Sequence, residues 1–326
     1  MNEGINYLFI SKILQYIPKN INPVNYLSDI LKISSKSVYR RIKGEIPFTL
    51  TEIFALSKEL NFSIDQILGL DKVEDVYFTL QADKVLSPED AFKQMLQQYY
   101  EHTERLNRAS RVESLMAMNH IPIIFTVFFD NLFKFSFYKW MHQNHRASLK
   151  YCFHDVAIPS EISSLKDKVI ASSIKNDNIT LIIDPNYILA TIKEIRYYHK
   201  RKLLTDDEAL LIRDDLFKMV DWAESLVSKG YIEGGGKINL YLLEFDLKVS
   251  SSYIEYDDIV KSNIMIYTVN PINIFNSKTF SEIHKRWFET IKKYSVLITQ
   301  SNEVMQAQYL DKQRNYIENI FTDDPF

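Results

Sequence analysis

The sequence predicts a multi-domain chain: an all-α N-terminal domain, a long connecting helix and a larger mixed α/β (or α+β) domain. Three observations predict this. Apolar residues recur at helical spacing through the first 70 residues. A strong helix start follows near residue 88. After residue 142, short β-branched segments alternate with helical ones. The length of 326 residues fits two or three domains, and we place them at residues 1–70, 71–120 and 121–326.

The first domain is expected to contain five short helices. Apolar residues have helical spacing in residues 7–16, and again in residues 24–33. Thr49 and Glu52 have the spacing of a capping box that opens a fourth helix. A second capping box, at residues 63–66, opens a short fifth helix. The second and third helices are joined by a very short turn.

The third of these helices, residues 35–43, is strongly basic on one face. Ser34 is suited to cap its N-terminus, and Gly44 follows its last residue, where a left-handed conformation costs least. Val38 and Ile42 share the apolar face. A basic outer face suits a phosphate-lined groove, and the plainer alternative is a solvated charged face. The outer face carries Lys36, Tyr39, Arg40 and Lys43, with Arg41 at the margin.

Two segments of this domain carry a family resemblance. They are L31-K-I-S-S-K-S-V-Y-R-R-I-K-G44 and F62-S-I-D-Q-I-L-G69. Together with the helix between them, they resemble the Cro/C1 (phage-repressor-like) helix-turn-helix family of bacterial regulators. The resemblance covers residues 5–70. It implies that Ser35, Lys36 and Arg40 reach base edges, and that Tyr39, Arg41 and Lys43 lie nearer the DNA backbone. The family commonly has Gly in the turn where this chain has Lys32.

The charge distribution and the composition indicate which binding partners are compatible with the chain. Residues 1–70 carry eight Lys and Arg against six Asp and Glu, whereas the remainder carries 31 against 36. An acidic body would repel DNA, which leaves the N-terminal domain as the attractive surface. The single cysteine, Cys152, excludes intramolecular disulfides and cysteine-rich zinc sites. The first residues lack a signal-peptide pattern, and the apolar run at residues 121–129 is too short to cross a bilayer. We therefore expect a cytoplasmic protein without a membrane partner.

Residues 71–120 are expected to form a linker and a long helix. Ser87 and Pro88 begin this helix, and acidic residues follow in its first turn. An apolar stripe with a spacing near 3.5 residues carries the predicted helix to about Met118. A dimer-forming helix and an ordinary packing helix fit this stripe equally well. Its members are Phe92, Leu96, Tyr99, Leu106, Ala109 and Leu115.

The third domain begins with an aromatic-rich segment. Seven aromatic residues lie between Phe125 and Tyr138, a density that indicates core and leaves an apolar ligand pocket as the alternative. Capping patterns predict a helix that starts at Asp184 and another that starts at Thr205. Strands are expected at residues 149–153, 179–183, 238–247, 252–256, 263–269 and 295–299. Helices are expected at residues 184–200, 205–228, 279–294 and 302–321.

No catalytic or metal-binding motif stands out in this domain. The triglycine at residues 234–236 lacks the spacing of a phosphate-binding loop. His142 and His145 have no carboxylate beside them at metal-ligand spacing, and Asp184 is explained as a helix cap. The basic segment at residues 197–202 fits the C-terminal end of a helix. We therefore expect no enzyme activity, catalytic residue, cofactor or metal.

The sequence thus predicts a sequence-specific DNA-binding transcriptional regulator. Its partners would be double-stranded DNA and a second copy of the chain, with the larger domain dimerising or sensing a small-molecule effector. A different class remains open. The larger domain could be an enzyme or a protein-interaction module to which the helical domain adds targeting.

Overall fold

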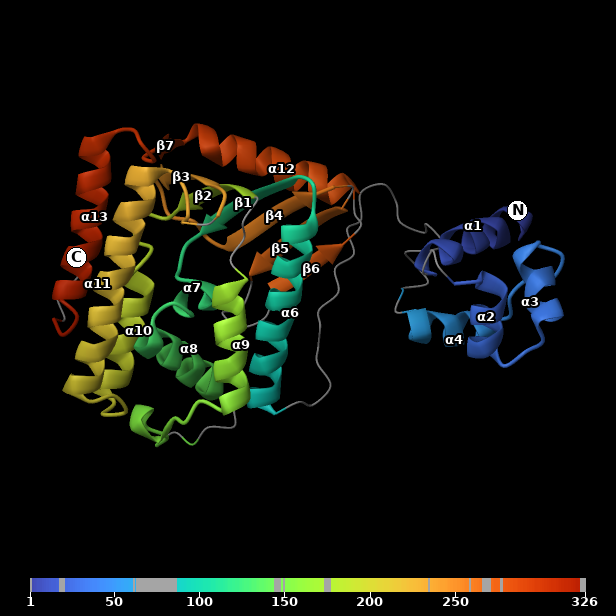
Figure 1. The fold of residues 1–326 in the computed structure, drawn as a ribbon, viewed down its shortest axis with the longest axis horizontal. Helices are drawn as coiled ribbons and strands as arrows, with labels where there is room; N and C mark the ends of the chain where they lie inside the picture. The colour runs from blue at the N-terminus through green and yellow to red at the C-terminus, as the bar shows by residue number, and fades with distance from the viewer. Residues whose placement is uncertain are drawn as a thin grey trace. The chain divides into compact units, whose positions relative to one another are not determined.

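The computed structural model describes residues 2–17, 21–60, 62, 87–143, 148, 150–172, 177–233, 235–257, 259–265, 271–275 and 278–322. The chain divides into two compact units, Met1–Tyr77 and Phe78–Phe326. The smaller unit is helical and the larger one mixes helices with a sheet, which confirms the predicted fold class (Figure 1). The predicted fifth helix, which opens at residues 63–66, and the predicted linker after residue 70 lie outside the described residues.

The smaller unit is built from short helices around one apolar core. The helices are α1 (Asn2–Ile13), α2 (Pro23–Leu31), α3 (Ser35–Ile42) and α4 (Leu50–Leu60), with a 3-10 turn at Leu14–Tyr16. Asn22 caps α2 by accepting hydrogen bonds from the amides of Val24 and Asn25. The buried residues of the core come from all four α-helices and from the segments beside them: Phe9, Ile10, Ile13, Ile17, Leu27, Val38, Phe48, Leu56 and Phe62.

The larger unit is organised around a seven-stranded sheet with the order β6-β5-β4-β1-β2-β3-β7. Three adjacent strands of this sheet, β1, β2 and β3, run parallel. The other strands pair antiparallel with their neighbours. The bounds are β1 Val112–Met118, β2 Asp177–Ile183, β3 Lys237–Leu243, β4 Ser250–Tyr256, β5 Ile259–Met265, β6 Pro271–Phe275 and β7 Ser295–Leu297.

Helices cover both faces of this sheet (Figure 1). On one face α12 (Lys278–Lys293) packs Phe288 and Ile291 against residues of β1 and β4. The other face holds the largest core cluster, to which α8, α10, α11 and α13 all contribute. The remaining bounds are α6 Pro88–Arg108, α7 Ile123–Thr126, α8 Asp130–Gln143, η2 Phe153–Asp155, α9 Ser160–Ala171, α10 Leu189–Lys200, α11 Asp206–Lys229 and α13 Glu303–Glu318.

The long connecting helix is shorter than the sequence predicts. It ends at Arg108, and Val112–Met118 forms β1 between β2 and β4, so the predicted helix at residues 109–118 was wrong. The apolar stripe of α6 is used within its own unit, because Phe92 and Leu96 are fully buried in the main core. The packing helix, not the dimer-forming helix, is therefore the alternative that fits. Both α6 and β1 belong to the larger unit.

Two further expectations need correction, and one strand was missed. The strand expected at residues 149–153 is absent from the described part of that segment, where η2 begins at Phe153. Asp184 does not cap a helix: its carboxylate accepts hydrogen bonds from the amides of Asn186 and Leu247, and α10 begins later, at Leu189. The strand β6 had not been predicted. The capping box at Thr205 and the helix α11 that it opens are confirmed.

Candidate nucleic-acid interface

The basic helix is present and is held at both ends as expected. The Ser34 hydroxyl accepts a hydrogen bond from the Ser37 amide at the N-terminus of α3. Lys43 is the C-cap of α3, and Gly44 follows it with a φ of +77°. An added Cβ at Gly44 would meet no atom within 4 Å, so only the backbone conformation favours glycine there.

The turn between α2 and α3 is unusual in one residue. Lys32 has φ 54° and ψ 38°, the left-handed conformation that glycine adopts more easily. The Ser28 hydroxyl donates to the Ile33 carbonyl and closes the turn from the side of α2. At this position the Cro/C1 family, which this domain resembles, commonly has Gly. The lysine therefore carries a modest cost in backbone strain.

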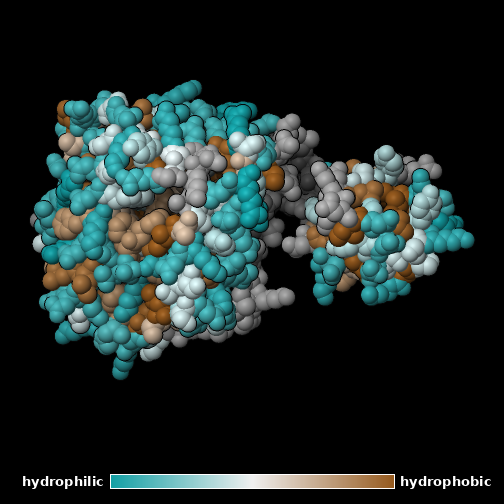
Figure 2. Space-filling view, viewed as in Figure 1, coloured by the Kyte–Doolittle hydropathy of each residue, from teal (hydrophilic) through white to brown (hydrophobic). Residues whose placement is uncertain are grey.

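The opposite face of α3 fixes the helix to the unit. Val38 is fully buried, and Ile33 and Ile42 pack against the same core. Because side chains four residues apart share a helix face, this anchoring turns the other side of α3 outward. Figure 2 shows that the surface over this helix is largely hydrophilic.

The outward face keeps most of the predicted DNA-binding residues accessible: Ser35, Lys36, Tyr39, Arg40 and Lys43 are all exposed. The Lys43 ammonium lies 5.7 Å from the centroid of the Tyr39 ring. The Arg40 Nε lies 3.1 Å from a carboxylate oxygen of Glu45, and both side chains are about half exposed. An exposed pair of this kind contributes at most about 1 kcal/mol, so Arg40 can exchange this partner for another acceptor.

Arg41 lies elsewhere than expected. Its Nε and Nη2 atoms donate to the two carboxylate oxygens of Glu52 at 2.9 and 2.8 Å, and its Nη1 atom donates to the Ser37 hydroxyl at 2.7 Å. Both charged side chains of this pair are largely buried, with exposures of 12% and 14%. Arg41 therefore ties α3 to α4 and does not present its charge on the outer face.

Glu52 serves two structures at once. It completes the capping box of α4, because it accepts the Thr49 amide at 2.9 Å while its own amide donates to the Thr49 hydroxyl. Burial alone would raise the pKa of Glu52. The hydrogen bonds from Arg41 and Thr49 outweigh this effect and place its pKa below the ordinary value. The carboxylate is thus charged at neutral pH and holds the two helices together.

The comparison with protein families bears on this unit. Residues 17–89 match the model of the BetR domain. This is a helix-turn-helix domain of DNA-binding type, and the match includes α2, α3 and α4. It covers less than a quarter of the chain. The searches of curated proteins and of solved structures found no match.

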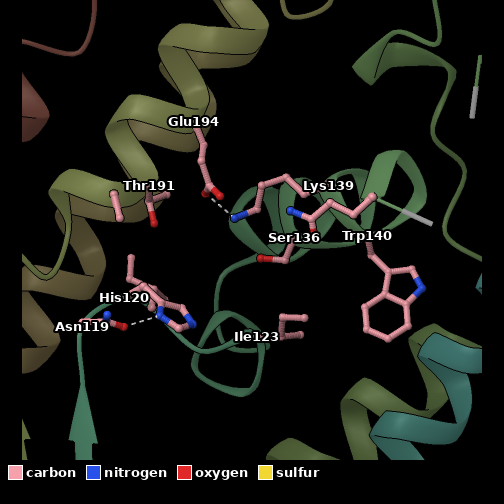
Figure 3. Close-up of a pocket in the computed structure, with 11 residues that line it drawn as sticks. Asn119, His120, Ile123, Ser136, Lys139, Trp140, Thr191 and Glu194 are labelled. Carbon is pink, nitrogen blue, oxygen red and sulfur yellow. Dashed lines mark hydrogen bonds and ion pairs between the residues drawn. The ribbon is translucent and has the colours of Figure 1, made fainter. Parts of the chain in front are cut away.

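The larger unit holds a polar cavity of about 220 Å³ just beyond the carboxyl end of β1 (Figure 3). Asn119 and His120 line it after the end of β1, and residues of α8 and α10 line it from the two helices. The Lys139 ammonium and the Glu194 carboxylate form an ion pair between these two helices at the edge of the cavity. The hydroxyl residues Ser136 and Thr191 are buried in the walls.

The histidine of this cavity is held in one orientation. His120 Nδ1 lies 2.7 Å from the Asn119 side-chain oxygen, which also accepts a hydrogen bond from Ser250. Burial, and the positive charge of Lys139, lower the pKa of His120. A neutral imidazole that donates through Nδ1 keeps Nε2 as an acceptor. The cavity thus offers a hydrogen-bond acceptor, hydroxyls and charges of both signs to a small ligand.

A second, apolar cavity of about 60 Å³ lies between the sheet and α11 and α13. Phe125 and Trp222 are among its lining residues. Most of the aromatic segment predicted as core is indeed buried, including Phe133, Phe135 and Tyr138. Its first residue, Phe125, lines the apolar cavity, as the alternative of an apolar pocket predicts.

Several site residues were not predicted. Glu45 and Glu52, which pair with the two arginines of α3, lie beyond the helix in sequence and give no periodic signal. Asn119 and His120 follow β1 directly, so a strand assigned to residues 112–118 would have marked them as residues at the carboxyl end of a sheet. No helix in the described part of the chain has both the length and the apolar character needed to cross a membrane.

Proposed function

We propose that this protein is a sequence-specific DNA-binding transcriptional regulator whose Cro/C1-type domain places α3 in the major groove. One observation carries the proposal. The buried anchor Val38 turns a face of exposed basic and polar residues outward, and this face lies on a helix of a helix-turn-helix domain. A helix fits the major groove of B-DNA, where base edges present distinct donors and acceptors.

The exposed residues divide into two roles in this proposal. Lys36 and Arg40 donate to guanine edges, and Ser35 contacts either base. Tyr39 and Lys43 contact the DNA backbone and set the register of the helix. Arg41, which is paired with Glu52, supports α3 instead of neutralising a phosphate. Arg40 must exchange Glu45 for a base, which costs little because that pair is exposed.

The larger unit supplies dimerisation and sensing. One helix-turn-helix domain covers a single half-site, so a homodimer on a two-fold-related operator is the expected form. The polar cavity beside Lys139 and Glu194 is a suitable place for a small polar effector. Such a sensor binds its ligand without converting it, and the proposal assigns no enzyme activity to the chain. Its site of action would be the cytoplasm, where a bacterial chromosome lies.

The proposal is tested by the DNA binding of the full chain and two matched variants. A selection from random DNA first defines the preferred site. Arg40→Ala should then lose about 1–3 kcal/mol of discrimination at one base position, while its affinity for random DNA changes less. Lys248→Ala removes one exposed positive charge from the larger unit and should leave both affinities unchanged. Equal losses for specific and random DNA in Arg40→Ala would refute the assigned base contact, and a chain without a preferred site would refute the function.

The alternative is an enzyme or interaction module with a helical targeting domain. The polar cavity favours this alternative, because histidines with a lowered pKa and partly buried ion pairs also occur in active sites. Incubation with candidate metabolites distinguishes the two, since a sensor returns its ligand unchanged whereas an enzyme accumulates product.

A further inference from the structure

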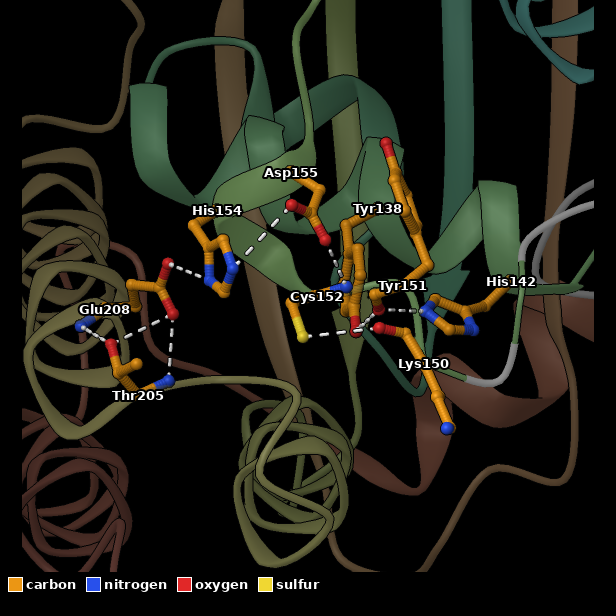
Figure 4. A network of polar contacts seen from close by, with 9 residues as sticks. All are labelled: Tyr138, His142, Lys150, Tyr151, Cys152, His154, Asp155, Thr205 and Glu208. Carbon is orange, nitrogen blue, oxygen red and sulfur yellow. Dashed lines mark hydrogen bonds and ion pairs between the residues drawn. The ribbon is translucent and has the colours of Figure 1, made fainter.

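A turn on the surface of the larger unit brings together a thiol, an imidazole and a carboxylate. Cys152 directly precedes the 3-10 turn η2, and His154 and Asp155 lie within this turn. One donor atom from each of these three side chains lies within 4.8 Å of the others. Figure 4 shows the three side chains grouped around the turn, with Glu208 of α11 on the far side of the imidazole.

The turn itself is firmly anchored. The Phe153 ring is buried in the main core, and its amide donates to the Leu203 carbonyl at 2.9 Å. This contact holds η2 against the loop that leads into α11. The donor groups are therefore mounted on fixed backbone, although the His154 and Asp155 side chains are exposed.

Each carboxylate has one oxygen occupied and one oxygen turned to the imidazole. Asp155 accepts the Cys152 amide through Oδ2, and its Oδ1 lies 3.7 Å from His154 Nε2. Glu208 accepts from Thr205 through Oε2, and its Oε1 lies 3.8 Å from His154 Nδ1. Both distances to the imidazole are too long for hydrogen bonds. The 3.7 Å pair has about the separation of two ligands on one tetrahedral ion, which is roughly 3.3–3.7 Å for metal–ligand bonds of 2.0–2.3 Å.

We propose that Cys152 Sγ, His154 Nε2 and Asp155 Oδ1 bind one zinc-like transition-metal ion. Water completes the tetrahedron. Glu208 accepts a hydrogen bond from His154 Nδ1 and orients the ring, the arrangement typical of metal-binding histidines. A sulfur, nitrogen and oxygen donor set selects Zn²⁺ or Co²⁺ over Mg²⁺ or Ca²⁺, which prefer oxygen alone.

Binding requires two local changes. The thiol loses its proton to solvent and gives up its hydrogen bond to the Lys150 carbonyl, which is 3.3 Å long. The side chains must also close from a spread of up to 4.8 Å to ligand distances, which rotation of exposed groups allows. The hydrogen bond from the metal-bound His154 to Glu208 would then join η2 to the N-terminus of α11. The sequence carries this signal in the spacing Cys152-x-His154-Asp155, which has too few cysteines for the familiar zinc motifs.

The test is a titration of the untagged full chain, reduced and metal-free, with Co²⁺. We expect one equivalent to bind, with a thiolate-to-cobalt charge-transfer band in the near ultraviolet and displacement of Co²⁺ by Zn²⁺. Cys152→Ser should lose the band. Glu208→Gln should keep the band and weaken binding by about 10–100-fold. His199→Ala, which alters an imidazole paired with Asp206, serves as the matched control and should behave as the parent protein.

The same titrations can also contradict the proposed metal site. An absence of one-equivalent binding to the parent chain, or a charge-transfer band that persists in Cys152→Ser, excludes this site. Binding that Glu208→Gln leaves unchanged removes Glu208 from the assignment. Far-ultraviolet circular dichroism of each metal-free variant shows that the chain is folded. None of these readouts depends on DNA binding.

Discussion

Two adjacent arginines of α3 have different roles, and the difference lies in their partners. Arg40 and Glu45 are about half exposed, whereas Arg41 and Glu52 are largely buried and joined by two hydrogen bonds. An exposed ion pair contributes little, but removing one partner of a buried pair leaves the other charge unsatisfied. We infer that Arg40 is available to DNA and that Arg41 stabilises the domain.

This difference predicts the pH dependence of the smaller unit. Because the pKa of Glu52 is lowered in the folded state, its contribution to stability is present above the unfolded pKa and is lost as the pH falls through the folded pKa. Glu52→Gln should lower the free energy of unfolding by about 1–3 kcal/mol at pH 7. The difference from the parent protein should shrink as acid protonates Glu52. Denaturant unfolding across the acid range measures both effects.

Glu45→Gln is the matched control, because it makes the same chemical change in the exposed pair with Arg40. Its free energy of unfolding should stay within about 1 kcal/mol of the parent value. Equal destabilisation by the two substitutions would show that burial of the Arg41 pair has no special effect.

At this scale the sequence predicts residue type better than residue partner. The positions of the exposed face of α3 follow from helical periodicity, because Val38 fixes which side is buried. The role of Arg41 does not follow, because Glu52 is eleven residues away and reaches it only through the packing of α4 on α3. The same limit applied to Asp184, whose partner Leu247 is 63 residues distant.

At the scale of elements, α3 lies between two left-handed residues. Lys32 ends α2 with φ 54°, and Gly44 follows α3 with φ 77°. The non-glycine residue carries strain at the first position, while glycine relieves it at the second. The helix-turn-helix geometry is thus kept at Lys32 by contacts on either side, including the hydrogen bond from Ser28 to Ile33.

Reciprocal substitutions measure this strain. Lys32→Gly should stabilise the smaller unit by up to about 1 kcal/mol, since relief of strain is partly offset by the greater freedom of glycine in the unfolded chain. Gly44→Ala should destabilise it by about 1–2 kcal/mol. No clash contributes at Gly44, where an added Cβ has open space. Thermal unfolding checks both values, and a loss of stability in Lys32→Gly would contradict the strain assigned to Lys32.

The sequence predicts poorly those elements whose secondary structure depends on pairing with strands that are distant in the sequence. Residues 112–118 contain leucine, methionine and alanine, which favour helix, and they follow a true helix start at Ser87. They form a strand because β2 and β4 pair with them on both sides and bury most of their side chains. Local patterns sufficed for α11, where a capping box and an apolar face lie within one segment.

At the scale of the whole molecule, the two units have separate cores. The core that includes Leu27 and Val38 lies wholly in the smaller unit, and the cluster that includes Phe133 and Ile192 lies wholly in the larger one. The sequence predicts a helical domain followed by an α/β domain, because each class has its own periodicity. It does not reveal the strand order, since the central parallel strands are joined only through long helical connections.

Because the two units have separate cores, we expect each unit to unfold in its own transition. The proposed function predicts which of the two transitions DNA shifts. A ligand stabilises only the folded unit that binds it, by about 2.7 kcal/mol at a free concentration of 100 times Kd. Calorimetry of the full chain should therefore show two transitions. Operator DNA should raise the temperature of the smaller unit's transition, which Glu52→Gln identifies by lowering it. The transition of the larger unit should shift less, because its net charge is negative and its residues make no direct contact with DNA in the proposed interface. A shift confined to the larger unit's transition would place the DNA-binding surface there and contradict the assignment of α3.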